Sequence, residues 1–514
     1  MPLVRRAAIA LFAVVLLSAF LAGPAQAATL TFTPNADAYS RSDYPDANYG
    51  SQTTLRIDNS PISRSYLRFN VQGLTRSVRK ATLRVFAQST ASSSGIELRS
   101  SSSSWGETTL TYRNAPSVGS SADRTGAFSA GQWVTLDATP LVRANGTVSL
   151  ALTTASSSSR TLASREDPAY RPQLIVEERP HLAGAQLHPL WGDASVAGFD
   201  RELDMARAAG MDTVRVDLGW STLEERGKGQ FSQWYVDKAD TFFQHAKDRG
   251  IRVIATFLST PCWASSAPEE LKQGCAGSWW SRGVQTYPPT RPADYADAAE
   301  WVARRWGDKL HAIEIWNEPN MSHFLKGPDP AASYAGMLKA AYPRIKAARP
   351  ALLVLGGALL YSDGNFLTDL YDRLGIKGSY DGISYHPYNQ GRDPDDVTAP
   401  AATKYSYQLG TKWMRDIMVA HGDSAVDLWI TEVGFPTCTL GAHPWCVTQD
   451  KQAEYTVDNY RIARERWPFV RAVITYNLRN KGTAPSYFED QMGLLWRDFT
   501  AKPAYNALAA ELKR

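Results

Sequence analysis

Two glutamates in the second half of the chain each follow a short apolar run. Glu318 lies in the segment 315–320, Ile-Trp-Asn-Glu-Pro-Asn, and Glu432 in the segment 430–434, Ile-Thr-Glu-Val-Gly. Two carboxyl groups can cleave a glycosidic bond between them: a protonated one donates to the leaving oxygen, and an ionised one attacks the anomeric carbon. A single glutamate at a strand end is more often a partner in an ion pair. The two together, with Asn317 beside the first, favour the catalytic interpretation.

The elements that must carry these glutamates alternate between strand and helix from residue 182 to residue 514. Apolar runs typical of buried strands begin near residues 184, 213, 252, 312, 353, 382, 428 and 472, and amphipathic helical segments lie at 199–209, 237–249 and 295–306. Eight such units predict an α/β fold, a (β/α)8 TIM barrel. A doubly wound open sheet is the alternative, but no Gly-rich phosphate loop follows the first strand.

The two glutamates fall where a barrel collects its functional side chains. Active sites of such barrels form at the C-terminal ends of the strands. Glu318 follows the fourth predicted strand and Glu432 the seventh. These strands lie on roughly opposite sides of an eight-strand ring, so we expect the two carboxyl groups to face each other across a substrate.

The segment 316–320, together with Thr431 and Glu432, resembles glycoside hydrolase clan A. Within that clan, residues 183–508 are most similar to family 39 and its endo-acting exopolysaccharide-hydrolase relatives, with family 5 next. Members of the clan place the acid/base after an Asn on strand four and the nucleophile on strand seven. The resemblance therefore implies that Glu318 is the acid/base and Glu432 the nucleophile.

The same resemblance implies roles for four supporting residues. Asn317 would hydrogen-bond the sugar 2-hydroxyl, a contact that strengthens in the transition state. Arg215, at the end of strand two, would hold the nucleophile ionised, because a neighbouring cation lowers the pKa of a carboxyl group. Tyr388 would donate to the nucleophile from strand six, with His386 close by.

Aromatic residues near the predicted strand ends are candidates for sugar platforms or for ordinary packing. Strand eight carries Tyr476 where the clan commonly has a Trp as the floor of the −1 subsite. Other candidates follow strands one, two, three and seven: Trp191, Trp220, Trp263 and Phe435.

The four cysteines fall into two local pairs, Cys262 with Cys275 and Cys438 with Cys446. Four cysteines allow three connectivities, and local pairing is the economical choice among them. Zinc binding is the competing interpretation, but neither pair has the two-residue spacing of a zinc site. We therefore expect two disulfides that staple the loops after strands three and seven.

Residues 28–178 predict a second domain, an all-β antiparallel sandwich, because short alternating strands recur without helical stretches. The segment resembles secreted β-sandwich modules of bacterial extracellular enzymes, some of which bind polysaccharide. The matching residues are 36–39, 48–50, 64–69, Trp105 and 163–166. The resemblance implies a candidate carbohydrate-binding module, with a spacer or stabilising domain as the alternative. Asp37 is either a turn residue or part of a calcium site.

Residues 1–27 read as a secretory signal peptide. Arg5 and Arg6 precede the apolar run 7–21, and Ala25-Gln26-Ala27 offers small residues for cleavage. We expect a secreted, extracellular monomer without a membrane anchor. The net charge of +4, with dispersed Lys and Arg, does not indicate a nucleic-acid partner. The expected partner is a polysaccharide substrate, with no metal and no cofactor, since the two-carboxylate reaction requires none.

These features together predict a retaining β-glycoside hydrolase acting on a polysaccharide. The appended module favours a long or insoluble polymer and hence endo action. The alternatives are an exo-acting β-xylosidase or β-glucosidase, a transglycosylase that uses the same covalent intermediate, and a non-catalytic polysaccharide-binding protein.

Overall fold

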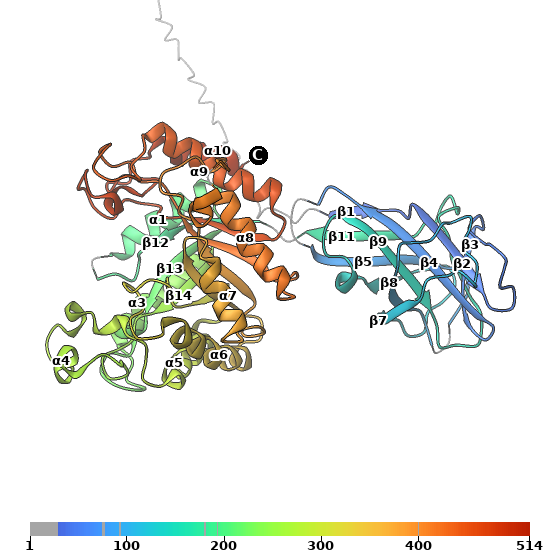
Figure 1. Cartoon of the computed structure of the whole chain (residues 1–514), viewed down its shortest axis with the longest axis horizontal. Coiled ribbons are helices and arrows are strands. Elements are labelled where there is room, and N and C mark those ends of the chain that lie inside the picture. Colours follow the sequence, from blue (N-terminus) through green and yellow to red (C-terminus); the bar gives the residue numbers. More distant parts are fainter. Residues whose placement is uncertain are drawn as a thin grey trace, which may run out of the picture.

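The computed structural model of the 514-residue chain describes residues 29–513, except 75–77, 92–93, 179–180, 193 and 399. The expected signal peptide, residues 1–27, lies outside the described residues. The described residues form a strand-rich N-terminal body and a larger body of alternating strands and helices (Figure 1). No helix in this described part is long and apolar enough to cross a bilayer.

The N-terminal body contains eleven described strands and is all-β, as predicted. Its strands pair antiparallel in the order β1-β11-β5-β10-β3-β4-β9-β6-β7, with β2 beside β4 and β8 beside β5. The bounds are β1 Thr29–Phe32, β2 Ala36–Arg41, β3 Thr54–Asn59, β4 Ile62–Val71, β5 Val78–Ala87, β6 Glu97–Ser101, β7 Val118–Arg124, β8 Gln132–Asp137, β9 Gly146–Thr153, β10 Arg160–Ala163 and β11 Gln173–Glu178, with a 3₁₀ turn at Thr139–Leu141.

Alternation along the strands builds the core of this body. On β5, Leu83 and Val85 are fully buried, whereas Arg84 and Phe86 between and beyond them are only partly buried. Successive side chains of a strand point to opposite faces. The buried set packs in one apolar cluster between the layers, and the other set faces outward.

The C-terminal body is a closed barrel of eight parallel strands, which confirms the predicted fold class. Its first and last strands pair through Leu182 and Ala472 to close the ring. The strands are β12 Leu182–Leu187, β13 Thr213–Gly219, β14 Arg252–Leu258, β15 Ala312–Ile315, β16 Leu353–Leu360, β17 Gly382–His386, β18 Asp427–Val433 and β19 Val470–Thr475.

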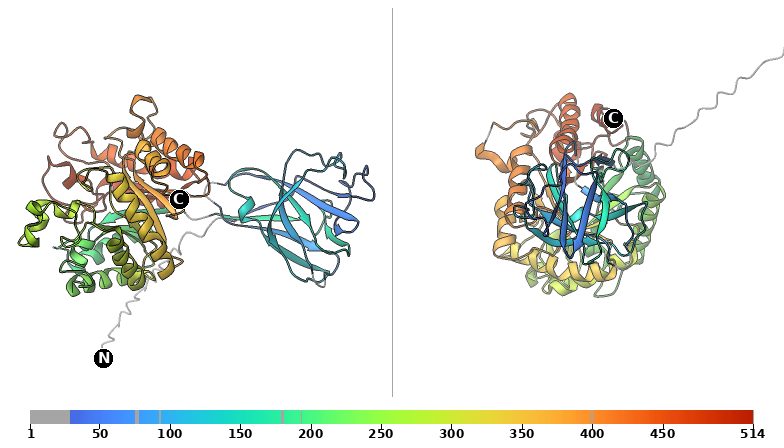
Figure 2. Two further views of the ribbon diagram at one scale, coloured as in Figure 1. Left: turned by 60° about the horizontal axis from the view of Figure 1, so that its bottom comes forward. Right: turned by 90° about the vertical axis from the view of Figure 1, so that its right-hand side faces the viewer.

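Helices surround the barrel and cover the outward faces of its strands (Figure 2). The main helices are α1 Val196–Ala208, α3 Gln233–Asp248, α5 Pro292–Trp306, α6 Pro330–Ala348, α7 Gly364–Asp372, α8 Tyr407–Ala420, α9 Gln449–Arg466 and α10 Pro503–Leu512. Short helices lie in the loops: α2 Trp220–Leu223, α4 Glu269–Lys272, and 3₁₀ turns at Gln273–Cys275, Trp279–Arg282, Val284–Thr286, Pro400–Tyr405 and Phe488–Gln491. The apolar stripes of the main helices join the largest core cluster.

The barrel interior is apolar at one end and charged farther along the strands. Ile254, Ala312 and Trp429 belong to a small cluster inside the ring. Two residues beyond Ala312, on the same side of β15, stands Glu314, which is fully buried. Glu314 accepts hydrogen bonds from Arg215 at 2.7 Å and from Thr256 at 2.8 Å. A charged layer thus lies between the apolar plug and the C-terminal mouth.

Candidate active site

Glu318 reaches the mouth through an unusual turn after β15. Trp316 has φ 66° and Glu318 has φ 43°, values that L-residues rarely adopt. The backbone N–H of Glu318 donates to the carbonyl of Ala358 at 2.9 Å, which holds this turn against β16. Such strained residues persist where the surroundings over-determine them, and they cluster at functional sites.

Glu432 reaches the mouth through a bulge in β18. The side chain of Trp429 points into the barrel, so strict alternation would send that of Glu432 outward. Between Ile430 and Val433, however, β18 has one residue more than its partner β19. A bulge of this kind re-aims a side chain, and here it turns Glu432 toward the interior.

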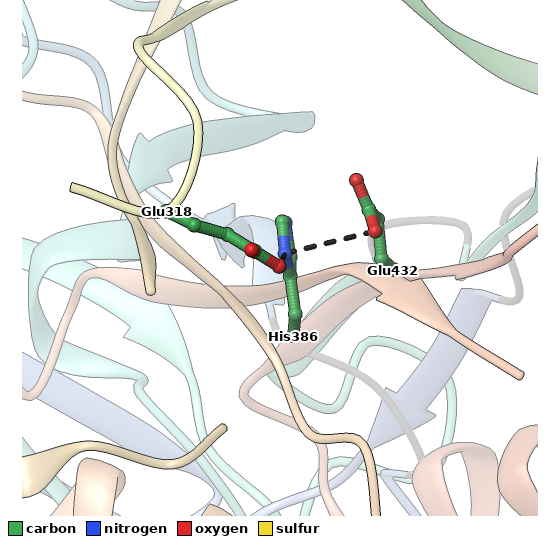
Figure 3. A group of neighbouring side chains, drawn as sticks. All are labelled: Glu318, His386 and Glu432. Carbon is green, nitrogen blue, oxygen red and sulfur yellow. Dashed lines mark hydrogen bonds and ion pairs between the residues drawn. The ribbon is translucent and has the colours of Figure 1, made fainter. Parts of the chain in front are cut away.

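The two glutamates lie on either side of His386, at the end of β17 (Figure 3). The Nδ1 atom of His386 lies 2.8 Å from Oε1 of Glu318 and 3.8 Å from Oε2 of Glu432. One carboxylate oxygen of each glutamate and one ring nitrogen of His386 all lie within 4.8 Å of one another. All three side chains are buried, so the two carboxyl groups share a poorly solvated space.

Arg215 organises the surroundings of Glu432. Its guanidinium is fully buried and contacts Glu432 Oε1. It also donates to Asn317 Oδ1 at 2.8 Å, to Gln186 Oε1 at 3.0 Å and to Glu314. These bonds fix Arg215 directly under Glu432.

Tyr388 completes the contacts of Glu432 by donating its hydroxyl to Oε2 at 2.8 Å. The structure therefore brings Glu318, Glu432, Arg215, Asn317, Tyr388 and His386 together in one network. His386, expected near the nucleophile, pairs more closely with Glu318.

Sequence reasoning missed Glu314 and Gln186. Both are buried polar residues on the inward side of their strands, β15 and β12, at the level of Arg215. A polar residue at an inward position of an otherwise apolar strand is the signal that could have identified them.

Burial sets the acidity of both glutamates, and their neighbours distinguish them. Burial raises the pKa of Glu318, the bond from His386 opposes the shift, and the charge of Glu432 adds to it. Burial also raises the pKa of Glu432, but there the charge of Arg215 and the hydroxyl of Tyr388 both oppose it. Burial lowers the pKa of His386. A guanidinium and a phenol thus oppose the raised pKa of Glu432, and the charge of Glu432 in turn helps to raise the pKa of Glu318.

The predicted aromatic residues occupy different environments. Tyr476 lies at the end of β19, accepts a hydrogen bond from Lys481 at 3.0 Å and contacts the Tyr388 ring edge-on at 6.4 Å. Trp191 is 41% exposed. Trp220 is fully buried against Trp263, so it offers no face to a sugar and belongs to the core.

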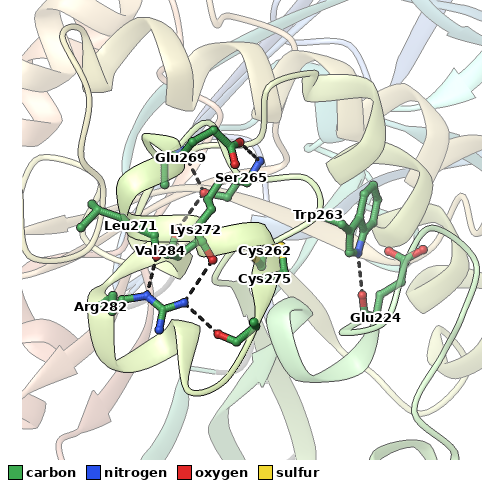
Figure 4. Close-up of a disulfide and its surroundings, with 12 residues drawn as sticks. Glu224, Cys262, Trp263, Ser265, Glu269, Leu271, Lys272, Cys275, Arg282 and Val284 are labelled. Atoms are coloured by element: carbon green, nitrogen blue, oxygen red, sulfur yellow. Dashed lines mark hydrogen bonds and ion pairs between the residues drawn. A yellow bond between two sulfur atoms is a disulfide. The ribbon is translucent and has the colours of Figure 1, made fainter.

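Trp263 is held by a hydrogen bond and Phe435 by packing. The indole N–H of Trp263 donates to the carbonyl of Glu224 at 2.7 Å (Figure 4). Phe435 is buried against Tyr455 and Val447.

A cavity of about 220 Å³ lies beside the mouth of the barrel, with Gln186, His188, Trp191 and Lys481 in its lining. The His188 ring packs against that of Trp191 at a tilt of 35°, and His188 Nδ1 lies 3.4 Å from Asp217, two residues beyond Arg215 on β13. Burial would raise the pKa of Asp217, but His188 and Arg215 hold it below its ordinary value. Asp217 and His188 are further polar groups at the mouth that sequence reasoning missed.

Another aromatic residue near the site, Trp445, comes from the loop after β18. Its ring stacks on Tyr388 with centroids 5.9 Å apart and meets Tyr361 edge-on at 6.2 Å. Tyr361 lies near Glu318, because its backbone N–H donates at 2.9 Å to the carbonyl of His386, the residue whose ring pairs with Glu318. Trp445 therefore lies beside neighbours of both glutamates.

Both expected disulfides are present. Cys262 pairs with Cys275 in the loop after β14, and Cys438 pairs with Cys446 in the loop after β18. In the first loop, Arg282 donates to the carbonyls of Leu271 at 2.5 Å and Lys272 at 3.1 Å (Figure 4). The loops beside the mouth are therefore fixed covalently and by hydrogen bonds.

Two groups of side chains are close enough together to share a metal ion. One consists of Glu318, His386 and Glu432. Here Glu318 pairs with His386, and Glu432 accepts from Arg215 and Tyr388. The other, in the N-terminal body, is Asp37, Glu107 and Glu166. There, Arg165 pairs with Glu107 at 3.1 Å and with Glu166 at 2.8 Å, and its backbone N–H donates to Asp37. Arg165 thus supplies the positive charge in this group.

The fold of the barrel has counterparts among solved structures. A family 39 glycoside hydrolase from the gut symbiont Bacteroides cellulosilyticus WH2 aligns with a TM-score of 0.53 and 19% identity, over 87% of this chain and 79% of that one. A glucosidase from Croceicoccus marinus aligns with a TM-score of 0.48 and 17% identity, over 65% and 67%. No curated protein matches the chain.

Two family models match the sequence itself. Residues 28–178 match carbohydrate-binding module family 96, and residues 176–468 match cellulase, glycosyl hydrolase family 5. The predicted resemblance to clan A is confirmed, with family 5 as the family whose model matches. Because that match spans more than half of the chain, the protein belongs to glycosyl hydrolase family 5 and is a glycosidase with an N-terminal module of the carbohydrate-binding type.

Proposed function

We propose that the protein is a secreted retaining β-glycosidase that cleaves internal bonds of a β-linked polysaccharide. The observation that carries the proposal is the short separation of the two carboxyl groups, whose nearest oxygens lie within 4.8 Å. Retaining glycosidases hold their carboxyl groups about 5 to 5.5 Å apart, whereas inverting enzymes leave about 6.5 to 9.5 Å for a water molecule. The spacing here supports double displacement.

In the first step, protonated Glu318 donates its proton to the glycosidic oxygen while Glu432 attacks the anomeric carbon. The leaving sugar departs and a covalent glycosyl-Glu432 ester forms. Formation of the ester removes the charge of Glu432, which had raised the pKa of Glu318. In the second step Glu318, now ionised, takes a proton from water, which attacks the anomeric carbon and releases Glu432.

The supporting residues divide between the two glutamates. Arg215 and Tyr388 favour the ionised nucleophile and aim its free lone pair at the sugar. The amide oxygen of Asn317 is engaged by Arg215, so its amide nitrogen is the atom for the sugar 2-hydroxyl. His386 orients Glu318 through the 2.8 Å bond.

Three further parts of the proposal have separate support: a polymeric substrate, endo action and export. The module matching a carbohydrate-binding family supports a polymeric substrate. Two disulfides support an oxidising compartment, because disulfides are rare in reducing cytosol. Two aromatic groups near the mouth, Trp191 and Tyr476 beside His188 and Trp445 beside Tyr361, support the binding of sugars beyond the cleaved bond.

The test is a hydrolysis screen against β-linked polysaccharides and aryl β-glycosides, with product configuration followed by NMR. We expect one polymer to be cut to mixed oligosaccharides whose new ends first appear as the β-anomer. Release of single sugars only would favour an exo-acting enzyme, and longer products would favour a transglycosylase. First appearance of the α-anomer would contradict the retaining mechanism.

Variants assign the mechanism to residues. Glu432→Ala should abolish activity, and added azide should restore turnover of an activated aryl glycoside by forming a glycosyl azide. Glu454→Ala, an exposed glutamate on α9, is the matched control and should retain full activity. Activity that survives Glu432→Ala would show that the nucleophile is assigned wrongly.

A further inference from the structure

Three aromatic rings meet on the surface of the N-terminal body, far along the sequence from the active site. Phe86 of β5 stacks on Tyr170, which precedes β11, with centroids 3.8 Å apart and planes 12° apart. Trp133 of β8 meets both rings edge-on, at 5.6 Å and 6.4 Å. We call these three residues the aromatic platform.

The platform lies on the outer face of the sheet, outside the core. Leu83 and Val85 of β5 belong to the apolar cluster between the layers, so Phe86 points the opposite way from Val85. Phe86 pairs directly with Trp133 across the strands, so both rings share this face. Tyr170 is 41% exposed and its stacked partner covers only one side of the ring.

Polar side chains border the rings. Arg84, two residues before Phe86 on the same face, lies over the Trp133 ring at 4.5 Å. Its guanidinium donates to the side-chain amide of Gln173 at 3.3 Å, and Thr135 is its cross-strand neighbour. The surface thus combines flat apolar rings with hydrogen-bonding groups at their edge.

We infer that this platform, with Arg84 and Gln173, binds the glycan chain. The inference rests on the proposed function for its ligand, a β-linked polysaccharide. A pyranose ring has apolar C–H faces and equatorial hydroxyls around its rim. Flat aromatic rings match the faces, while the amide and guanidinium match the hydroxyls. An apolar protein partner would instead bury the remaining hydrogen-bonding capacity of Arg84 and Gln173, at a desolvation cost.

The position of the platform leaves it open to a polymer. Val78 at the start of β5 pairs with Glu178, the last residue of β11 and the one nearest the barrel in sequence. Phe86 lies at the other end of β5, about 26 Å away at the usual rise of a strand. A chain bound there lies away from the junction with the barrel.

Binding is measured with the full-length chain carrying Glu432→Gln, so that the polymer is not degraded. The probes are insoluble cellulose, xylan and mannan in pull-down assays and their soluble derivatives in affinity electrophoresis. We expect Tyr170→Ala and Trp133→Ala each to weaken binding about tenfold, which corresponds to about 1.4 kcal/mol. Tyr170→Phe, which keeps the ring, should bind as the parent does.

The matched control is Tyr44→Ala, which removes an exposed tyrosine elsewhere on the same body and should leave binding unchanged. With Glu432 restored, the platform variants should hydrolyse a soluble aryl glycoside at the parent rate. A failure of the platform would appear in the binding assays, whereas a failure of the proposed function would appear as missing hydrolysis by the parent chain. Melting temperatures test folding of each variant.

Three outcomes would overturn the inference. Unchanged binding with a lowered melting temperature would make the rings a packing cluster, since cross-strand aromatic pairs also stabilise sheets. A dimer that Tyr170→Ala dissociates would make the platform a contact between copies. If the parent chain bound none of the polymers, the platform would have no glycan ligand.

Discussion

Glu318 and Glu432 are equally buried, and the chemical difference between them comes from single contacts. Glu432 has a guanidinium and a phenol as neighbours, which favour its ionised form. Glu318 has an imidazole as its neighbour instead, and the charge of nearby Glu432 helps to raise its pKa. A protonated acid beside an ionised nucleophile is the state that double displacement needs at its start.

The first prediction concerns pH. Activity should fall at low pH as Glu432 becomes protonated and at high pH as Glu318 loses its proton, which gives a bell-shaped profile of kcat/KM. Because the Tyr388 hydroxyl lowers the pKa of Glu432, Tyr388→Phe should move the acidic limb to higher pH and leave the basic limb in place. An acidic limb that does not move would mean that another group controls it.

The second prediction concerns the coupling of the two carboxyl groups. The charge of Glu432 raises the pKa of Glu318, so Glu432→Gln should lower that pKa. Carbon-13 NMR titration of labelled glutamate side chains in this variant and in the parent measures the change. A pKa of Glu318 that stays constant or rises would contradict the proposed exchange of roles between the two steps.

The third prediction concerns Glu314, which touches no substrate and acts through Arg215. Removing one member of a buried ion pair costs about 3 to 5 kcal/mol, because the remaining charge stays buried. Glu314→Gln should lower the free energy of unfolding of the barrel by that amount in urea denaturation. It should also reduce kcat with little effect on KM, whereas Glu454→Gln on the surface should change neither.

At the level of elements, the loop after β18 links a covalent staple to the site. Cys438 and Cys446 close the loop, and Trp445 beside the second cysteine stacks on Tyr388. Gly391 approaches the backbone of Trp445 so closely that an added Cβ would lie 2.8 Å from its carbonyl oxygen. The backbone of Trp445 is thus confined by Gly391 and its ring by Tyr388.

The fourth prediction follows from this loop. Cys438→Ser with Cys446→Ser should lower kcat/KM for the polymer about tenfold, because Trp445 loses its position beside Tyr388. Trp445→Ala should show a similar loss with the disulfide intact. Cys262→Ser with Cys275→Ser is the comparison, since it opens the other disulfide, which closes a sequence separation of 13 residues rather than 8. Equal losses from both pairs would indicate general destabilisation rather than a role for Trp445.

The elements also show how far the sequence could be interpreted. Eight apolar runs predicted the eight barrel strands, because a strand buried on both faces leaves a continuous signal. The bulge that turns Glu432 inward could not be predicted, since it depends on the pairing of β18 with β19. Trp220 shows the opposite problem: its place after a strand suggested a platform, but tertiary packing buries it. Trp445 was missed because it lies within a long loop, and the way that loop folds decides whether its residues reach the site.

At the level of the whole molecule, the proposed export and the two disulfides can be tested by mass. The fifth prediction is that the mature protein begins at Ala28 and contains two closed disulfides. Intact-mass spectrometry of the exported protein should show the loss of residues 1–27, and reduction should add four hydrogen atoms. A retained N-terminus or free thiols would contradict export by this route.

The pairing of β1 with β11 gives the N-terminal body a property at the level of the gene. Thr29 lies opposite Glu177, so the first and last strands of the sandwich are neighbours and their outer ends leave it at one place. A recombination event on either side of this segment transfers every strand and all of its pairings together. The sandwich is therefore a transferable cassette, which can be joined to other catalytic domains without rebuilding its fold.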